Sequence, residues 1–270
     1  MRPPSSIILR RQDPFIKKLV ELRDEKNSAL LLLEGPRLLK EALQSHLVIQ
    51  TLVICQHEGQ NALPQEAALI ETARAQAKET IFVNESVFRV ISDVEEPQGV
   101  AAFCDRPRWS WNDLLDRKPR PLIILDGLQN PGNVAAICRT AEAADAAGVI
   151  TTSGTAHLFS PKSIRGGMGS TFRLPSLEHR TFGDIAVKLH AAGYQLLGAA
   201  VSQTSFPYTK VNWKQPWAIV LGQEGAGLRK DWQSHLHHMV AIPMAAPVDS
   251  LNVAASAAVL LYESHRQRNS

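Results

Sequence analysis

Five short apolar runs in the second half of the chain constrain the fold more than any other feature. In the first of them, PLIILDGL, apolar residues follow one another, as in a strand covered on both faces of a parallel sheet, instead of alternating with polar residues. Helical segments separate some of the runs, at about 133–147 and 184–192, and a helix follows the last one. The pattern predicts a parallel α/β domain over residues 121–270. The runs are PLIILDGL (121–128), GVITTSG (148–154), YQLLGAAV (194–201), WAIVLG (217–222) and MVAIPM (239–244).

A smaller α/β domain is predicted in front of it, over residues 1–105. Strand-like runs such as IQTLVIC (49–55) and GVAAFC (99–104) alternate there with helical segments. Pro36 suits the first turn of a helix over 36–46. Residues 106–120 mix proline, charge and tryptophan and are predicted to be a linker. Its two tryptophans, Trp109 and Trp111, either stack on bases or pack the linker against a domain, and packing is the more ordinary outcome.

Composition excludes several classes of protein. The chain has 270 residues, of which 44% are hydrophobic, enough for an ordinary core and unlike a disordered segment. A formal net charge of +3 allows a polyanionic partner without requiring one. No run reaches the roughly 20 apolar residues of a membrane span, and the amino terminus does not resemble a signal peptide. We therefore expect a soluble, cytoplasmic protein.

Metal ligands are not grouped in the sequence. The three cysteines, Cys55, Cys104 and Cys138, stand far apart, so neither a structural zinc nor a disulfide framework is expected. The HLHH run at 235–238 has no acid or cysteine at ligand spacing, which favours an ordinary surface turn. The sequence thus predicts no metal.

Two loops that follow strands stand out, because open α/β sheets bind ligands at the carboxyl ends of their strands. In LDGLQNPGNVAAICRTAEA (125–143), Asn133 follows a Pro-Gly turn and suits a helix N-cap, with Arg139 six residues further on. In IVLGQEGAGL (219–228), glycines surround Glu224 and would let the backbone approach a ligand closely. The second loop matches neither the dinucleotide fingerprint GxGxxG nor a phosphate loop. Taken singly, each loop also fits an ordinary cap or turn.

A third loop, IPMAAPVDSLNVAAS (242–256), places Ser250 and Asn252 on either side of Leu251. The helix that follows is apolar nearly all round and is therefore expected to be buried. Asp249 or Ser250 suits its N-cap. A cap accounts for one polar residue, but the other needs a separate partner. The pair therefore indicates a binding site as well as a helix start.

The three loops, in this order and spacing, resemble the SpoU/TrmH family of SPOUT RNA methyltransferases over about residues 121–265. The segment SPKSIRGGMGSTFRLP (160–175) resembles the family's stretch between its first two motifs. The run LLLEGPRLLKEAL (31–43) resembles the opening of the ribosomal-protein-like RNA-binding domain found in front of many members. The resemblance implies a SPOUT domain with a trefoil knot, a homodimer, and S-adenosylmethionine as cofactor.

The implied reaction is methyl transfer to a ribose 2′-hydroxyl of structured RNA, with ribosomal RNA favoured over tRNA. Arg139 is permanently cationic, so we expect it to hold a phosphate and stabilise developing charge instead of acting as the base. The other polar residues would orient the ribose and Arg139. Carried over by residue, the catalytic set is Asn133, Arg139, Glu224, Ser250 and Asn252.

The resemblance also implies the residues that hold cofactor and RNA. Ala135 and Ala246 stand where the family usually has glycine, and we expect them to narrow the cofactor space slightly. Expected RNA contacts are Lys162, Arg165 and Arg173 between the first two motifs, and Arg37, Arg10, Arg11, Lys17 and Lys18 in the front domain. Expected cofactor contacts are Ala199, Ala200, Leu221, Gly222, Gly225, Ile242, Met244, Leu251 and Ala254.

Two rival interpretations stay open at this point. One is a non-catalytic RNA-binding protein of the same fold, which would have no need to keep all five polar residues together. The other is a nucleotide-dependent α/β enzyme of another class, such as a dehydrogenase, against which the missing GxGxxG counts. Fold alone does not separate these functions.

Overall fold

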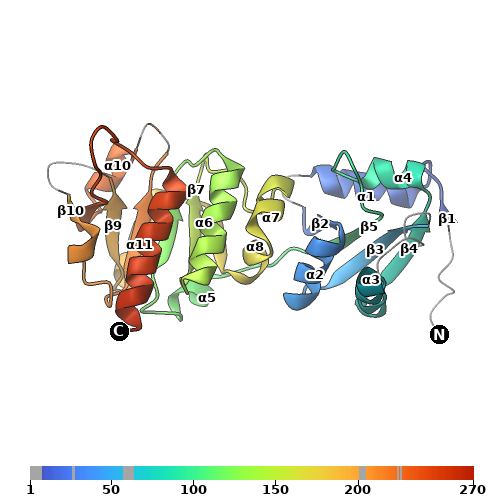
Figure 1. Cartoon of the computed structure of the whole chain (residues 1–270), viewed down its shortest axis with the longest axis horizontal. Helices are drawn as coiled ribbons and strands as arrows, with labels where there is room; N and C mark the ends of the chain where they lie inside the picture. The colour runs from blue at the N-terminus through green and yellow to red at the C-terminus, as the bar shows by residue number, and fades with distance from the viewer. Residues whose placement is uncertain (1–7, 26–27, 57–63, 201–204, 224, 226) are drawn as a thin grey trace. The chain divides into compact units, whose positions relative to one another are not determined.

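The computed structural model describes residues 8–25, 28–56, 64–200, 205–223, 225 and 227–270. The chain divides into two compact units, Met1–Pro107 and Arg108–Ser270, each built around its own sheet (Figure 1). No helix in the described part of the chain combines the length and the apolar character needed to cross a bilayer.

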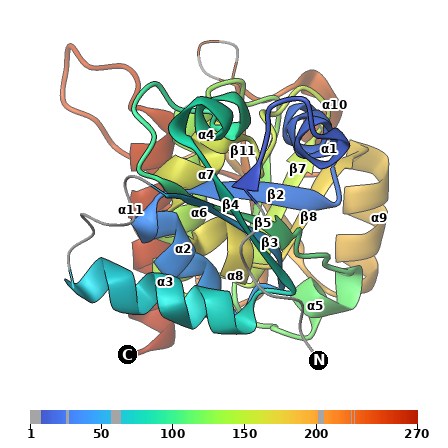
Figure 2. The ribbon, with the colours of Figure 1, turned by 90° about the vertical axis from the view of Figure 1, so that its right-hand side faces the viewer.

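The first unit has a five-stranded sheet in the order β1-β4-β3-β5-β2. Strand β5 runs antiparallel to both of its neighbours, whereas β1, β4 and β3 run parallel to one another. Helices α1 and α4 cover one face and α2 and α3 the other (Figure 2). The predicted small α/β domain is thereby confirmed. Its elements are β1 (Ile8–Leu9), α1 (Pro14–Asp24), β2 (Leu30–Glu34), α2 (Pro36–Gln44), β3 (Ile49–Cys55), α3 (Pro64–Gln76), β4 (Glu79–Val83), α4 (Glu85–Ile91) and β5 (Val100–Asp105).

The second unit has a seven-stranded sheet in the order β10-β12-β9-β11-β6-β7-β8, in which every pair is parallel. This confirms the predicted parallel domain. Its elements are α5 (Trp111–Leu115), β6 (Leu122–Leu125), α6 (Pro131–Ala143), β7 (Gly148–Thr152), α7 (Pro161–Gly167), α8 (Ser170–Arg173), β8 (Ser176–Arg180), α9 (Phe182–Ala191), β9 (Gln195–Ala199), β10 (Phe206–Pro207), the 3₁₀ turn η1 (Tyr208–Lys210), β11 (Trp217–Leu221), α10 (Lys230–Gln233), β12 (His238–Ala241) and α11 (Val253–Arg268).

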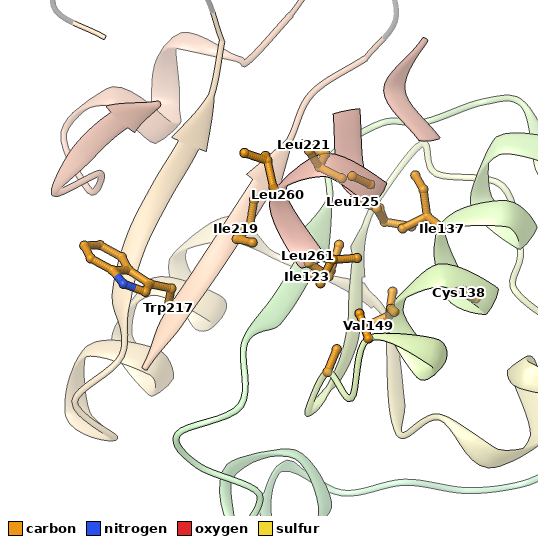
Figure 3. Packing of buried hydrophobic residues seen from close by; sticks show 14 of the residues in the cluster. Ile123, Leu125, Ile137, Cys138, Val149, Trp217, Ile219, Leu221, Leu260 and Leu261 are labelled. Carbon is orange, nitrogen blue, oxygen red and sulfur yellow. The ribbon is translucent and has the colours of Figure 1, made fainter. Parts of the chain in front are cut away.

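Strand β6 shows why its sequence is apolar at every position. Ile123 and Leu125 point into a core closed by α6 and α11, which lie side by side (Figure 1; Figure 3). Leu122 and Ile124 point into a second core, closed by α5, α9 and α10. Side chains alternate across a strand, so a strand covered on both faces must be apolar throughout.

Residues 106–120 contain α5, which begins with a capping box between Ser110 and Asp113. Trp109 and Trp111 pack against the second unit's core, the more ordinary of the two outcomes expected for them. The expectation that helix α11 is buried is wrong for much of the helix in the single chain. Only its inner face is buried against α6 and the sheet, and Tyr262 is 51% exposed. The trefoil knot implied by the resemblance stays a prediction.

Candidate active site

Helix α6 brings the first polar loop to the carboxyl edge of the second sheet. Its N-cap is Asn130, whose side chain accepts from Gly132 N at 2.8 Å, and Pro131 occupies the first helical position. The expectation that Asn133 caps this helix is therefore wrong, because Pro131 fits the first turn and moves the start upstream. Asn133 lies within the first turn instead, where its side chain is half-buried and reaches the third loop.

Helix α11 brings the third polar loop to the same place. Its N-cap is Asn252, whose Oδ1 accepts from Ala254 N at 2.9 Å and from Ala255 N at 3.4 Å. The predicted caps Asp249 and Ser250 lie before the helix, so that prediction is wrong. Because Oδ1 is used by the cap, Nδ2 faces outward and donates to Asn133 Oδ1 at 3.2 Å. The first and third motifs, 119 residues apart, thus touch directly.

The glycine-rich loop closes tightly after β11. A Cβ added to Gly222 would collide with the backbone carbonyl of Gly227 and lie 2.6 Å from Leu228 N. Gly227 N donates to Gln223 O at 2.8 Å and so closes the turn. Gly225 and Gly227 have positive φ values of 82° and 70°, which favour glycine. Glu224 lies outside the described residues.

A cavity of about 740 Å³ opens between these loops, within the usual range for a small-molecule site. Ser250 and Asn252 line it together with most of the residues expected to hold the cofactor. Ala254 is the exception, since it packs against the core between α6, α11 and the sheet. Expected residues on the wall are Ala199, Ala200, Leu221, Gly222, Gly225, Ile242, Met244 and Leu251; further residues that the sequence did not assign to a cofactor are Gln223, Gly227, Val240, Ala241, Asp249, Val253, Ser256 and Leu260.

A buried carboxylate ties the glycine-rich loop to the centre of the sheet. Asp126 directly follows β6, and its side chain is 0% exposed. Its Oδ1 accepts from Thr152 Oγ1 at 2.6 Å and from Arg229 Nη2, and its Oδ2 accepts from Arg229 Nε at 2.8 Å. The hydrogen bond to Asp126 raises the pKa of Arg229. The Asp126–Arg229 pair is not among the residues predicted from the sequence, although a carboxylate directly after four apolar residues is a signal, because such groups are rarely buried without a partner.

The remaining catalytic candidate, Arg139, stands apart from the cavity. It lies on α6, is exposed, and makes no hydrogen bond or ion pair with the residues that the structure describes. It is also not among the described residues that line the cavity. The polar candidates therefore divide into Ser250 and Asn252 on the cavity wall, Asn133 hydrogen-bonded to Asn252, and Arg139 further along α6.

The basic residues expected to contact RNA also divide. Lys162 and Arg165 lie exposed on α7, and Arg37 lies exposed on α2 of the first unit, as do Arg10, Arg11, Lys17 and Lys18 at or near α1. Arg173 instead makes a two-point contact with Glu142 of α6, at 2.6 and 3.1 Å. Burial opposes ionisation of Glu142, but hydrogen bonds from Arg173 and Ser170 lower its pKa. Arg173 therefore serves at least in part to join α8 to α6.

The two alanines in place of the family's usual glycines do not narrow the cavity. Ala135 is buried and faces Gly166 of α7, where an added Cβ would lie 2.9 Å from the Ala135 side chain. Ala246 is exposed, and neither alanine lines the cavity. The expected loss of cofactor room is therefore wrong, because Ala135 fills a helix–helix contact instead.

Comparison with known proteins gives the same two-part division. Residues 120–262 match the SpoU rRNA Methylase family, and residues 13–102 match the MRM3-like substrate binding domain. The chain is 28% identical over 246 residues to the 23S rRNA (guanosine(2553)-2′-O)-methyltransferase of Bacillus subtilis (strain 168), covering 91% of this chain and 92% of that one.

Two further relatives extend the comparison. The SpoU methyltransferase AviRb from Streptomyces viridochromogenes, in complex with the cofactor AdoMet, has a similar structure, with a TM-score of 0.83 at 27% identity, covering 96% of this chain and 99% of that one. The tRNA (guanosine(18)-2′-O)-methyltransferase of Escherichia coli (strain K12) is 30% identical over 155 residues, which cover 57% of this chain and 67% of that one.

Proposed function

Because the chain belongs to the SpoU rRNA methylase family, whose members here are S-adenosylmethionine-dependent RNA 2′-O-methyltransferases, we propose that it methylates a ribose 2′-hydroxyl of ribosomal RNA. One observation carries the choice of ribosomal RNA. The relative that acts on 23S rRNA shares both units, over 91% of this chain, whereas the tRNA relative matches only 57%. The match to a substrate binding domain at 13–102 supports the proposal that the first unit binds the RNA.

The cavity fits S-adenosylmethionine in size and in lining. Its volume of about 740 Å³ is adequate, and Leu221, Ile242 and Leu251 provide apolar wall for an adenine ring. The backbone at Gly225 is open to close approach, because it carries no side chain and an added Cβ would meet nothing within 4 Å. When bound, S-adenosylmethionine supplies a methyl group made electrophilic by its sulfonium.

The residues at the cavity mouth would orient the acceptor. The hydrogen bond between Asn133 and Asn252 fixes both amides, which leaves their remaining polar atoms and Ser250 Oγ to hold a ribose in line with the donor. Arg139 cannot act as a base at neutral pH, since its guanidinium stays charged. We assign it to the target phosphate and to the charge that develops on the 2′-oxygen.

A homodimer is part of the same proposal. Arg139 stands away from the cavity of its own chain, and Tyr262 and Leu251 are 51% and 43% exposed. A second copy packed over α6 and α11 would cover this apolar surface and bring Arg139 close to a cavity. Sedimentation of the wild type against Tyr262→Asp tests the arrangement: we expect a dimer that becomes monomeric, and a monomeric wild type contradicts it.

Methyl transfer from labelled S-adenosylmethionine tests the function. Ribosomal RNA and tRNA, each lacking the native modification, are offered as separate acceptors to wild type, Arg139→Ala and a control, Lys188→Ala, on the opposite face of the sheet. We expect label on ribosomal RNA within alkali-resistant dinucleotides, since a 2′-O-methyl group blocks strand cleavage. Arg139→Ala should lose about 10²- to 10³-fold in rate while the control stays unchanged. Label on tRNA alone would move the target to tRNA.

A further inference from the structure

Three potential metal ligands meet beside α7, outside the site described above. His157 lies in the loop after β7, and Glu178 and His179 lie near the end of β8. His179 Nε2 is 3.0 Å from His157 Nδ1, and His157 Nδ1 is 3.8 Å from Glu178 Oε1. One ligand atom from each residue lies within 4.8 Å of the others. The sequence did not predict this group, because His157 and His179 are 22 residues apart.

A β-bulge aims two consecutive residues at the same point. Between the pairs Ile150–Leu177 and Thr152–Arg180, β8 has two intervening residues where β7 has one. In a regular strand Glu178 and His179 would point to opposite faces. The extra residue, with His179 at a positive φ of 53°, turns both toward His157. Bulges that re-aim side chains occur at functional sites, and positive φ in a residue other than glycine is uncommon.

Hydrogen bonds hold both arms of the group in place. Ser163 Oγ donates to the backbone carbonyl of His157 at 2.8 Å, and His179 N donates to Thr151 Oγ1 at 3.0 Å. Glu178 Oε1 accepts from Leu158 N at 2.8 Å, so its carboxylate is fixed against the loop that carries His157. The side chain of Glu178 is only 9% exposed. Ligands fixed in this way lose little conformational freedom when they bind an ion.

We propose that His157, Glu178 and His179 bind one divalent transition-metal ion, with zinc preferred. Two imidazoles and one carboxylate are a usual zinc ligand set, with a water in the fourth position. Zinc–nitrogen distances of about 2.0–2.1 Å place tetrahedral ligand atoms roughly 3.3 Å apart, between the 3.0 and 3.8 Å observed here. Calcium and magnesium, which prefer oxygen ligands, fit the two imidazoles poorly.

The ion would link the loop after β7 to the end of β8. That loop leads directly into α7, which carries Lys162 and Arg165, so the ion would set the position of a basic helix. The inference stands on side-chain geometry alone and does not depend on the proposed methyl transfer.

Zinc titration of the untagged, metal-stripped full chain, monitored by calorimetry, tests the site. A parallel titration with Co²⁺, monitored by absorption, reports on the ligands. The variants are His157→Gln and His179→Asn; asparagine tolerates positive φ, so the second keeps the backbone while it removes an imidazole. The control is His190→Gln, in the other histidine group, where the His190 and His237 rings are 5.0 Å apart. His237 Nδ1 there already accepts from Leu196 N at 3.0 Å.

We expect one Zn²⁺ per chain with a Kd of about 1 µM or lower. Each of the two ligand variants should weaken zinc binding at least tenfold. Even loss of a residue that only hydrogen-bonds to a metal ligand typically weakens metal binding about 10- to 100-fold. Zn²⁺ should also raise the unfolding midpoint of wild type and of His190→Gln, but not of His179→Asn. Absence of saturable binding below about 100 µM, or equal weakening in the control, would overturn the proposal.

Discussion

Glu34, at the end of a strand in the first sheet, and Asp126, directly after a strand in the second, are carboxylates with different kinds of partner. Glu34 ends β2 in the first unit and accepts from Ser92 Oγ at 2.6 Å and Asp93 N at 3.1 Å, which secures a nearby loop. Asp126 follows β6 in the second unit and reaches Arg229, 103 residues away, behind the glycine-rich loop of the cavity. Glu34 thus joins β2 to the segment after α4, 58 and 59 residues away, whereas Asp126 joins β6 to the loop that borders the cavity.

Strand direction accounts for this difference. All seven strands of the second sheet are parallel, so their carboxyl ends and the loops that follow lie on one edge. In the first sheet the reversed strand β5 lies between β3 and β2, so the loops after those two strands are about 10 Å apart. Convergent polar groups therefore collect in the second unit, and we expect cofactor effects to be confined to it.

The largest predicted effect uses two thiols as reporters of the two units. Burial raises the pKa of Cys104 in β5 and of Cys138 in α6 to about 12. At pH 8 only about one thiol in ten thousand is then ionised, so alkylation requires opening of the surrounding unit. S-adenosylmethionine at 100 times its Kd should slow alkylation of Cys138 about a hundredfold and leave Cys104 unchanged.

Mass spectrometry of the alkylated peptides measures both rates in one sample. S-adenosylhomocysteine, which has the same adenosine part without the methyl, serves as a second ligand that should also protect Cys138. Equal protection of both thiols would mean that the two units open together. The two units would then differ in their polar sites but not in how their stability responds to the cofactor.

The next effect concerns the Asp126–Arg229 pair. Arg229→Met leaves Asp126 buried without its charged partner, a change that costs 3–5 kcal/mol in a fully buried pair. Because Arg229 is 48% exposed, we expect about 2 kcal/mol, or about thirtyfold faster alkylation of Cys138 and no change at Cys104. Arg229→Lys keeps the charge and should lose less. An unaltered rate in Arg229→Met would show that Thr152 alone satisfies Asp126.

These particulars show what the sequence can and cannot predict. The parallel sheet was predictable, because strands covered on both faces must be apolar throughout. The start of α6 could also have been predicted, since Pro131 fits the first turn of a helix and makes Asn130 the N-cap. The pairing of Arg173 with Glu142 and the bulge in β8 could not be predicted from the sequence. Tertiary packing decides both which distant residues meet and the register of a strand.

The third prediction tests how closely the glycine-rich loop must fold. Gly222→Ala places a methyl group against the backbone of Gly227, which cannot move aside without opening the turn that borders the cavity. We expect S-adenosylmethionine to bind about tenfold more weakly, measured by calorimetry. The matched control is Gly183→Ala in α9, where an added Cβ meets nothing within 4 Å, and it should bind normally. Normal binding by Gly222→Ala would place the cofactor away from this loop.

The smallest predicted effect lies in the first unit and tests whether that unit contributes to RNA binding alone. Arg37 is exposed on α2, so Arg37→Ala should remove at most one phosphate contact without disturbing a fold. The slope of log K against log salt for RNA binding should then fall by about 0.7, with S-adenosylmethionine affinity and the rate at saturating RNA unchanged. Arg89→Ala, on α4 of the same unit and paired with Glu85, is the control for a general loss of charge. If Arg37→Ala lowered the saturated rate as well, the first unit would contribute to the chemical step, and the separation of binding from chemistry between the two sheets would have to be abandoned.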